Sequence, residues 1–89
     1  MSVTAAAMTN MLNYLFAAGA LNVRDDQPAV WVDYVGFACP DARDQDLLPA
    51  ARDAIREWAG NNRSWQVDAA RFAAAVRRVR NQRVADDES

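Results

Sequence analysis

The sequence contains no histidine and no lysine, and its only cysteine is Cys39. Without histidine, a single chain cannot build a His/Cys metal site, a Cys/His nucleophile pair or a Ser/His/Asp triad. The three glycines stand apart from one another, so the sequence also lacks a glycine-rich phosphate-binding loop. These absences predict a protein that is not an enzyme, with no catalytic residue, no metal site and no cofactor.

Long hydrophobic runs are missing as well, because no stretch approaches the ~18 apolar residues that cross a bilayer. The first residues show no basic segment followed by an apolar run, as a secretory signal would. Cys39 has no second cysteine with which to form an internal disulfide. We therefore expect a reduced, cytoplasmic protein that makes no contact with a membrane.

The chain has 89 residues, of which 52% are hydrophobic, and this is enough for one small domain. A domain of this size buries roughly 60 to 65% of the surface that its unfolded chain exposes, so it holds one modest core. We expect a single helical domain over residues 1–83, followed by a short acidic tail over residues 84–89.

Start and stop signals divide the chain into four helices, predicted over residues 4–18, 27–38, 47–59 and 69–83. Each start has a side chain that can accept hydrogen bonds from first-turn amides: Thr4, Asp26, Asp46 and Asp68. Prolines follow two of these caps inside the first turn, where a missing amide hydrogen costs nothing. Gly19 ends the first helix and Pro40 ends the second.

Helical spacing of apolar residues predicts the buried face of each helix. These faces comprise Met8, Met11, Leu12, Leu15 and Phe16; Val30, Trp31, Tyr34, Val35 and Ala38; Leu48, Ala51, Ile55, Trp58 and Ala59; and Ala69, Phe72, Val76 and Val79. Trp65 and Val67 should fold back onto the core, and Gly36 should mark a close approach within the second helix. The predicted fold is all-α, a compact bundle of about four short helices around a Trp-rich core that includes Trp31, Trp58 and Trp65.

Charge is distributed unevenly along the chain, although the net charge is only −2. Residues 1–49 carry a net charge of −4, residues 50–83 carry +5, and the tail carries −3. Arg52 and Arg56, beside Asp53 and Glu57, are typical of a solvated helix face with weak ion pairs.

A cluster of cations on the last predicted helix is the candidate partner-binding site: Arg71, Arg77, Arg78, Arg80 and Arg83. Five cations on one helix can neutralise phosphates whatever the nucleic-acid sequence, or they can contact an acidic protein surface. Alternatively, they can complement the helix dipole and pair with the acidic first half of the same chain.

Several segments resemble a known family: V-W-x-D-Y at residues 30–34, P-D-A-x-x-Q-D at 40–46, E-W-A at 57–59 and F-x-x-A-V-R-R-V-R at 72–80. The layout is similar to small helical replication accessory proteins of phages, the loaders and inhibitors of the replicative helicase, especially those of phages of GC-rich actinobacteria. This resemblance spans residues 8–83. It implies an all-α domain in the host cytoplasm that binds the helicase, holds it inactive and delivers it to an origin. Residues 84–89 stand where family members carry a longer C-terminal region that engages the helicase.

Three functions are therefore open. The first is a phage or prophage accessory protein that binds a host replication protein such as the replicative helicase. The second is a small DNA-binding regulator that uses the arginine-rich last helix, and the third is a phage inhibitor of another host protein. For the first we expect a monomer or a weak homodimer, with at most weak, nonspecific contact with nucleic acid.

Overall fold

The computed structural model describes residues 3–22, 24–60 and 66–88. Within these ranges the chain forms four α-helices and one 3-10 turn: α1 (Ala5–Ala17), α2 (Gln27–Ala38), η1 (Asp44–Asp46), α3 (Leu47–Gly60) and α4 (Ala69–Glu88). No strand occurs among the described residues. The prediction of an all-α fold is confirmed, and three of the four predicted helices match to within one residue at each end.

Helix α1 has the local signals at both ends that its sequence predicts. The side-chain oxygen of Thr4 accepts a hydrogen bond from the backbone amide of Ala7 at 3.2 Å. At the other end Gly19 adopts a φ of 82°, and its amide donates to the carbonyl of Phe16 while the next amide, of Ala20, donates to that of Leu15. This pair of bonds is the Schellman motif, which favours glycine because a side chain is strained at positive φ.

The predicted aspartate caps have different outcomes. Asp68 accepts a hydrogen bond from the amide of Arg71 at 2.8 Å and caps α4 as predicted. Asp26 occupies the N-cap position of α2 but makes no capping hydrogen bond with its side chain. Asp46 precedes α3, yet its carboxylate turns back to accept from the amide of Arg43 at 3.0 Å. The prediction that Asp26 and Asp46 cap their helices is therefore wrong, because each carboxylate faces another partner or solvent.

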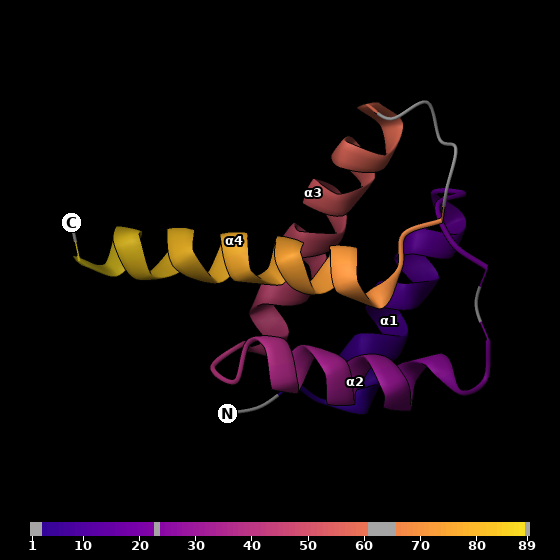
Figure 1. Cartoon of the computed structure of the whole chain (residues 1–89), viewed down its shortest axis with the longest axis horizontal. Helices are drawn as coiled ribbons and strands as arrows, with labels where there is room; N and C mark the ends of the chain where they lie inside the picture. The colour runs from indigo at the N-terminus through magenta and orange to yellow at the C-terminus, as the bar shows by residue number, and fades with distance from the viewer. Residues whose placement is uncertain (1–2, 23, 61–65, 89) are drawn as a thin grey trace.

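The helices form a small bundle in which α1 and α4 each pack against both α2 and α3. Figure 1 shows α4 crossing α3, with the last turns of α4 projecting beyond the other helices. The radius of gyration is 12.4 Å, close to the ~12 Å expected for a compact domain of this length. No helix in the described part of the chain is long and apolar enough to span a bilayer.

Every α-helix contributes to one hydrophobic core. Its helical members are Met8, Met11, Leu12 and Leu15; Trp31 and Val35; Leu47, Ala50, Ala51, Ala54 and Trp58; and Phe72, Ala73, Ala75 and Val76. The rings of Trp31 and Phe72 lie 5.4 Å apart and join α2 to α4. Many of the α3 and α4 members are alanines, which lets the helix backbones approach closely.

Five residues predicted to lie in the core are exposed: Phe16, Val30, Tyr34, Leu48 and Ala59. Apolar residues surround α2 on almost every side, so spacing alone could not decide which face meets the bundle. Trp31 and Val35 face inward, and the face that carries Val30 and Tyr34 points to solvent. In α3 the buried stripe includes Leu47 instead of Leu48, because Leu47 lies four residues before Ala51 and seven before Ala54, on the face that meets the core.

Two further expectations concern the connections and the glycines. Val67 is fully buried, and its amide donates to the carbonyl of Ala20 at 3.0 Å, so this part of the connection does fold back onto the core. Trp65 lies outside the described residues. The predicted close packing at Gly36 is wrong, because a Cβ placed there would meet no atom within 4 Å.

Helix α4 continues five residues beyond its predicted end and includes the acidic residues that follow Arg83. The side-chain amide of Gln82 donates to Asp86 at 2.9 Å, one turn further along the helix. Val84 is partly buried and extends the packed side of α4. The acidic segment is therefore helical through Glu88.

Candidate functional site

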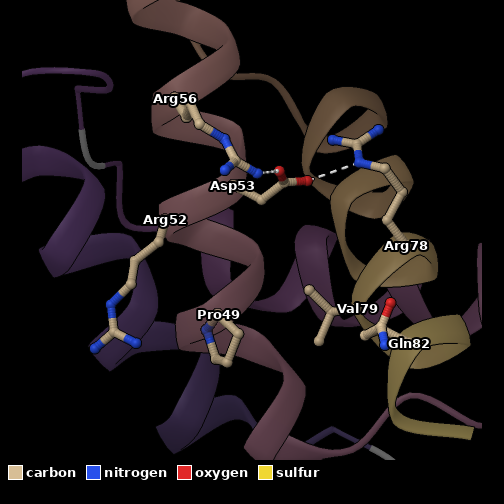
Figure 2. Close-up of a pocket in the computed structure, with 7 residues that line it drawn as sticks. All are labelled: Pro49, Arg52, Asp53, Arg56, Arg78, Val79 and Gln82. Atoms are coloured by element: carbon tan, nitrogen blue, oxygen red, sulfur yellow. Dashed lines mark hydrogen bonds and ion pairs between the residues drawn. The ribbon is translucent and has the colours of Figure 1, made fainter. Parts of the chain in front are cut away.

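The candidate arginine cluster lies on α4, and Asp53 of α3 connects α4 to the neighbouring helix. Asp53 accepts a hydrogen bond from Nε of Arg78 at 2.7 Å and another from Nη2 of Arg56 at 2.6 Å. Figure 2 shows Arg56 and Arg78 approaching this carboxylate from α3 and α4, while Arg52 extends away from it. Arg52 and Arg56 are exposed, as the predicted solvated face requires, whereas the Asp53 side chain is only 19% exposed and lies in the contact between α3 and α4.

Glu57 extends the same contact one turn further along α3. Its two carboxylate oxygens accept from Nη2 of Arg78 and Nη1 of Arg71, each at 3.3 Å. Because these side chains are about half exposed, each pair contributes well under about 1 kcal/mol on its own. These contacts also position the side chains, because they hold both Arg71 and Arg78 against α3.

A more buried pair joins the C-terminal half of α4 to η1. Arg83 donates from Nε and Nη2 to the two carboxylate oxygens of Asp46, at 3.0 and 3.2 Å. The side chains are 16% and 2% exposed, respectively. Two parallel bonds between a guanidinium and a carboxylate are strong and directional, so this pair fixes the position of α4 over η1.

Arg80 faces the end of α2. Its Nη1 lies 3.4 Å from Oδ2 of Asp41, and its Nε is buried with no hydrogen-bond partner among the described residues. The thiol of the buried Cys39 lies 3.5 Å from the other oxygen of Asp41. Asp41 therefore links α4 to the segment between α2 and η1.

Arg77 differs from the other four arginines of the cluster. Its side chain is exposed, and no ion pair joins it to a residue that the structure describes. The structure thus holds Arg71, Arg78, Arg80 and Arg83 in ion pairs within the chain, as the alternative of intramolecular pairing predicts, and leaves Arg77 facing outward.

Ion pairs, hydrogen bonds and burial change the proton affinity of several groups. Partial burial raises the pKa of Asp53, but hydrogen bonds from Arg56 and Arg78 outweigh this effect and hold the pKa below its ordinary value. Hydrogen bonding to Asp46 raises the pKa of Arg83. Burial, followed by the hydrogen bond to Asp41, raises the pKa of Cys39, so its thiol is protonated and weakly reactive at neutral pH.

A groove between α3 and α4 lies over these ion pairs. One hollow of about 420 Å³ is lined by Pro49, Arg52, Asp53, Arg56, Arg78, Val79 and Gln82 (Figure 2). A second hollow, of about 460 Å³, shares Pro49, Val79 and Gln82 and continues to Asp46, Arg83, Asp86 and Asp87. This α3–α4 groove is basic at one end and acidic at the other, with an apolar floor between them.

The outer face of α2 carries three large apolar side chains, and the sequence analysis predicts two of them, Val30 and Tyr34, in the core. Val30, Tyr34 and Phe37 are 56%, 38% and 82% exposed. They recur at i, i+4 and i+7, so they line one face of the helix, and the rings of Tyr34 and Phe37 lie 6.5 Å apart. We call these three residues the α2 stripe. The presence of more apolar residues than one buried face needs was the sequence signal for it.

No group of three or more Cys, Asp or Glu side chains in the described part of the chain converges as metal ligands would. The carboxylates of Asp53 and Glu57, one turn apart on α3, both contact arginines.

Comparison with known proteins gives no relative: no family model matches the sequence, and no curated protein or solved structure is significantly similar to it. The fold assignment therefore rests on the structure itself.

Proposed function

We propose that this chain is a non-enzymatic accessory protein of a phage or prophage that binds a host replication protein, with the replicative helicase as the leading candidate, and loads or inhibits it. The protein-binding role is supported by the surfaces described above. The choice of a replication protein is supported by the sequence resemblance alone.

The observation that carries the protein-binding role is the state of the arginine cluster. Four of its five guanidinium groups already contact carboxylates of the same chain. A phosphate backbone would have to displace these carboxylates or tolerate them nearby, and only the exposed Arg77 avoids that competition. Because sequence-independent DNA binding depends on the number of phosphates neutralised, the duplex-binding regulator is the weaker alternative.

The α3–α4 groove supports the same choice. A nucleic acid presents one sign of charge, whereas this groove changes from Arg52 and Arg56 at one end to Asp86 and Asp87 at the other. A protein segment can carry a complementary pair of charged ends around an apolar centre, which fits Pro49 and Val79 on the groove floor.

Affinity capture tests the proposal. The tagged chain is immobilised and exposed to nuclease-treated lysate of a GC-rich actinobacterium, and bound proteins are quantified by mass spectrometry against a bait that carries Arg77→Glu, Asp86→Lys and Asp87→Lys. We expect a replication protein to be enriched on the parent chain and to survive the nuclease treatment. Enrichment that disappears after nuclease treatment would instead support the DNA-binding regulator, and capture of a protein outside replication would support inhibition of another host process.

A further inference from the structure

The α2 stripe is exposed although the domain has a complete core elsewhere. Phe37 is the most exposed large hydrophobic side chain among the described residues, at 82%. An aromatic ring in water gains free energy when another apolar surface covers it, and contiguous exposed apolar residues rimmed by polar ones are typical of protein-binding sites. The stripe therefore needs an occupant, and the surrounding charges indicate its chemistry.

The charges around the α2 stripe are predominantly acidic. Residues 24–41 contain Asp25, Asp26, Asp33 and Asp41 against the single cation Arg24. Asp33 is exposed and lies three residues after Val30 and four before Phe37, so it borders the stripe directly. Two helices pack against α2. Helix α1 contains no charged residue, whereas α4 brings Arg80 to Asp41 at 3.4 Å. Asp25, Asp26 and Asp33 are therefore the acids near the stripe that no arginine of α4 contacts among the described residues.

A hollow at the N-terminal end of the α2 stripe also combines apolar side chains with a carboxylate. It measures about 230 Å³ and is lined by Arg24, Asp26, Gln27, Val30 and Trp31. The Asp26 carboxylate makes no capping bond to α2, and its contact with the exposed Arg24 is long, at 3.7 Å. The apolar walls suit the methylene stem of a lysine or arginine, and the carboxylate suits its charged end.

We propose that the outer face of α2 binds a basic amphipathic helix of a partner protein. The apolar residues of that helix would cover Val30, Tyr34 and Phe37, and its lysines or arginines would contact Asp26 and Asp33. This is the helix-on-helix mode of recognition, in which anchors recur at i, i+3 or i+4, and i+7. The inference rests on the proposed role as a protein-binding module and adds the surface and the chemistry of the partner.

Charge also decides against two other occupants. A second copy of this chain, docked through the same face, would bring its own Asp26 and Asp33 against those of the first. A nucleic acid would place phosphates against the same carboxylates. A cationic helix is the occupant that gains from both the apolar stripe and its acidic border.

A pair of synthetic peptides tests the charge requirement. Both are about 18 residues long, with leucine at i, i+3, i+4 and i+7; the outer positions are lysine in one peptide and glutamate in the other. Each is titrated into the isotope-labelled full chain, and amide resonances are followed by NMR. We expect the lysine peptide to shift resonances of α2, including Asp33 and Phe37, and the glutamate peptide to leave them unchanged. Equal shifts with both peptides, shifts confined to the α3–α4 groove, or no shifts would overturn the proposal.

Matched variants test the residues. Phe37→Ala and Asp33→Lys should each lower the affinity of the chain for the lysine peptide by about tenfold or more, since both side chains are central to the proposed surface. Leu48→Ala removes an exposed apolar side chain on α3, and Ala70→Lys adds a cation at an exposed position of α4; both should leave its affinity unchanged. If all four variants weaken binding alike, or none does, the assignment to α2 is wrong.

The failures of the two proposals are distinguishable. If a replication protein is captured equally by the parent chain and by Phe37→Ala, the proposed function stands and the α2 surface is not its docking site. If α2 binds the lysine peptide selectively but no replication protein is captured, the α2 assignment stands and the replication role falls. A parent chain that sediments as a dimer, and becomes a monomer on Phe37→Ala, would identify a second copy as the occupant and overturn the inference.

Discussion

Replacing Asp46 with alanine should lower the free energy of unfolding by about 2.5 to 4 kcal/mol, and the contacts of its carboxylate give this magnitude. Asp46 accepts a hydrogen bond from the amide of Arg43 at 3.0 Å, a contact that is worth about 1 kcal/mol. It also accepts two bonds from the Arg83 guanidinium, and hydrogen bonds to a charged group are worth about 1.5 to 3 kcal/mol. The carboxylate is almost fully buried, so little solvent is available to replace these partners.

The assay is urea unfolding followed by helical circular dichroism, with parent and variant at the same pH and salt. Asp26→Ala is the matched control, because Asp26 also precedes a helix but makes no capping bond with its side chain, and its one ion pair among the described residues is with the exposed Arg24. This control should lose less than about 0.5 kcal/mol. The double variant Asp46→Leu and Arg83→Met should recover most of the loss, since two apolar groups remove the unpaired buried charge that each single change leaves behind.

A loss below about 1 kcal/mol for Asp46→Ala, with the control unchanged, would refute this reasoning. It would mean that Arg83 finds water or another acceptor without cost, and that the buried pair does not hold α4 over η1. A domain of this size has only about 5 to 15 kcal/mol of stability in total, so the predicted loss is well within the range of the assay.

Four further substitutions test other parts of the structure. Gly36→Ala should stabilise the fold by about 0.5 to 1 kcal/mol, because the site is helical and no atom lies near an added Cβ. Gly19→Ala should destabilise the fold by about 1 to 2 kcal/mol, because φ is 82° there. Equal effects of the two substitutions in urea unfolding would contradict both assignments. Trp58→Ala should cost about 3 to 5 kcal/mol, and a melting temperature within a few degrees of the parent would place Trp58 outside the core. The lowered pKa of Asp53 implies stabilisation that is fully present above the ordinary value of 3.8 and is lost as the pH falls through the folded-state pKa. The melting temperatures of the parent and of Asp53→Asn should therefore converge between about pH 5 and pH 2, and a gap that stays constant with pH would contradict the ion-pair assignment.

The sequence predicts the helices well because their ends depend on local chemistry. Thr4, Gly19 and Asp68 act within a few residues of their own positions, and each makes the expected contact. The faces of α2 and α3 were harder to predict. In α2 nearly every position is apolar, so the spacing of apolar residues does not show which face is buried. The packed structure decides this, because Trp31 of α2 contacts Phe72 of α4.

The arginine partners could be anticipated only as a class. An acidic first half and a basic second half favour internal pairing, but Arg83 meets Asp46 across 37 positions of sequence and Arg78 meets Asp53 across 25. Such pairs depend on the crossing of α4 over η1 and α3, which follows from core packing. The α2 stripe was missed for a related reason, since an apolar helical face is assigned to the core unless the packed structure leaves it outside.

The central claim is that the arginines of α4 serve the fold and leave the surface suited to a protein partner. A titration of labelled duplex DNA with the intact chain at physiological salt, followed by fluorescence anisotropy, tests it most directly. We predict no saturable binding at submicromolar concentrations, because four of the five guanidinium groups are paired and acidic residues follow them on the same helix. Submicromolar affinity, with log K falling by roughly 0.9 per log unit of salt for each of several contacts, would contradict it and identify the chain as a DNA-binding protein.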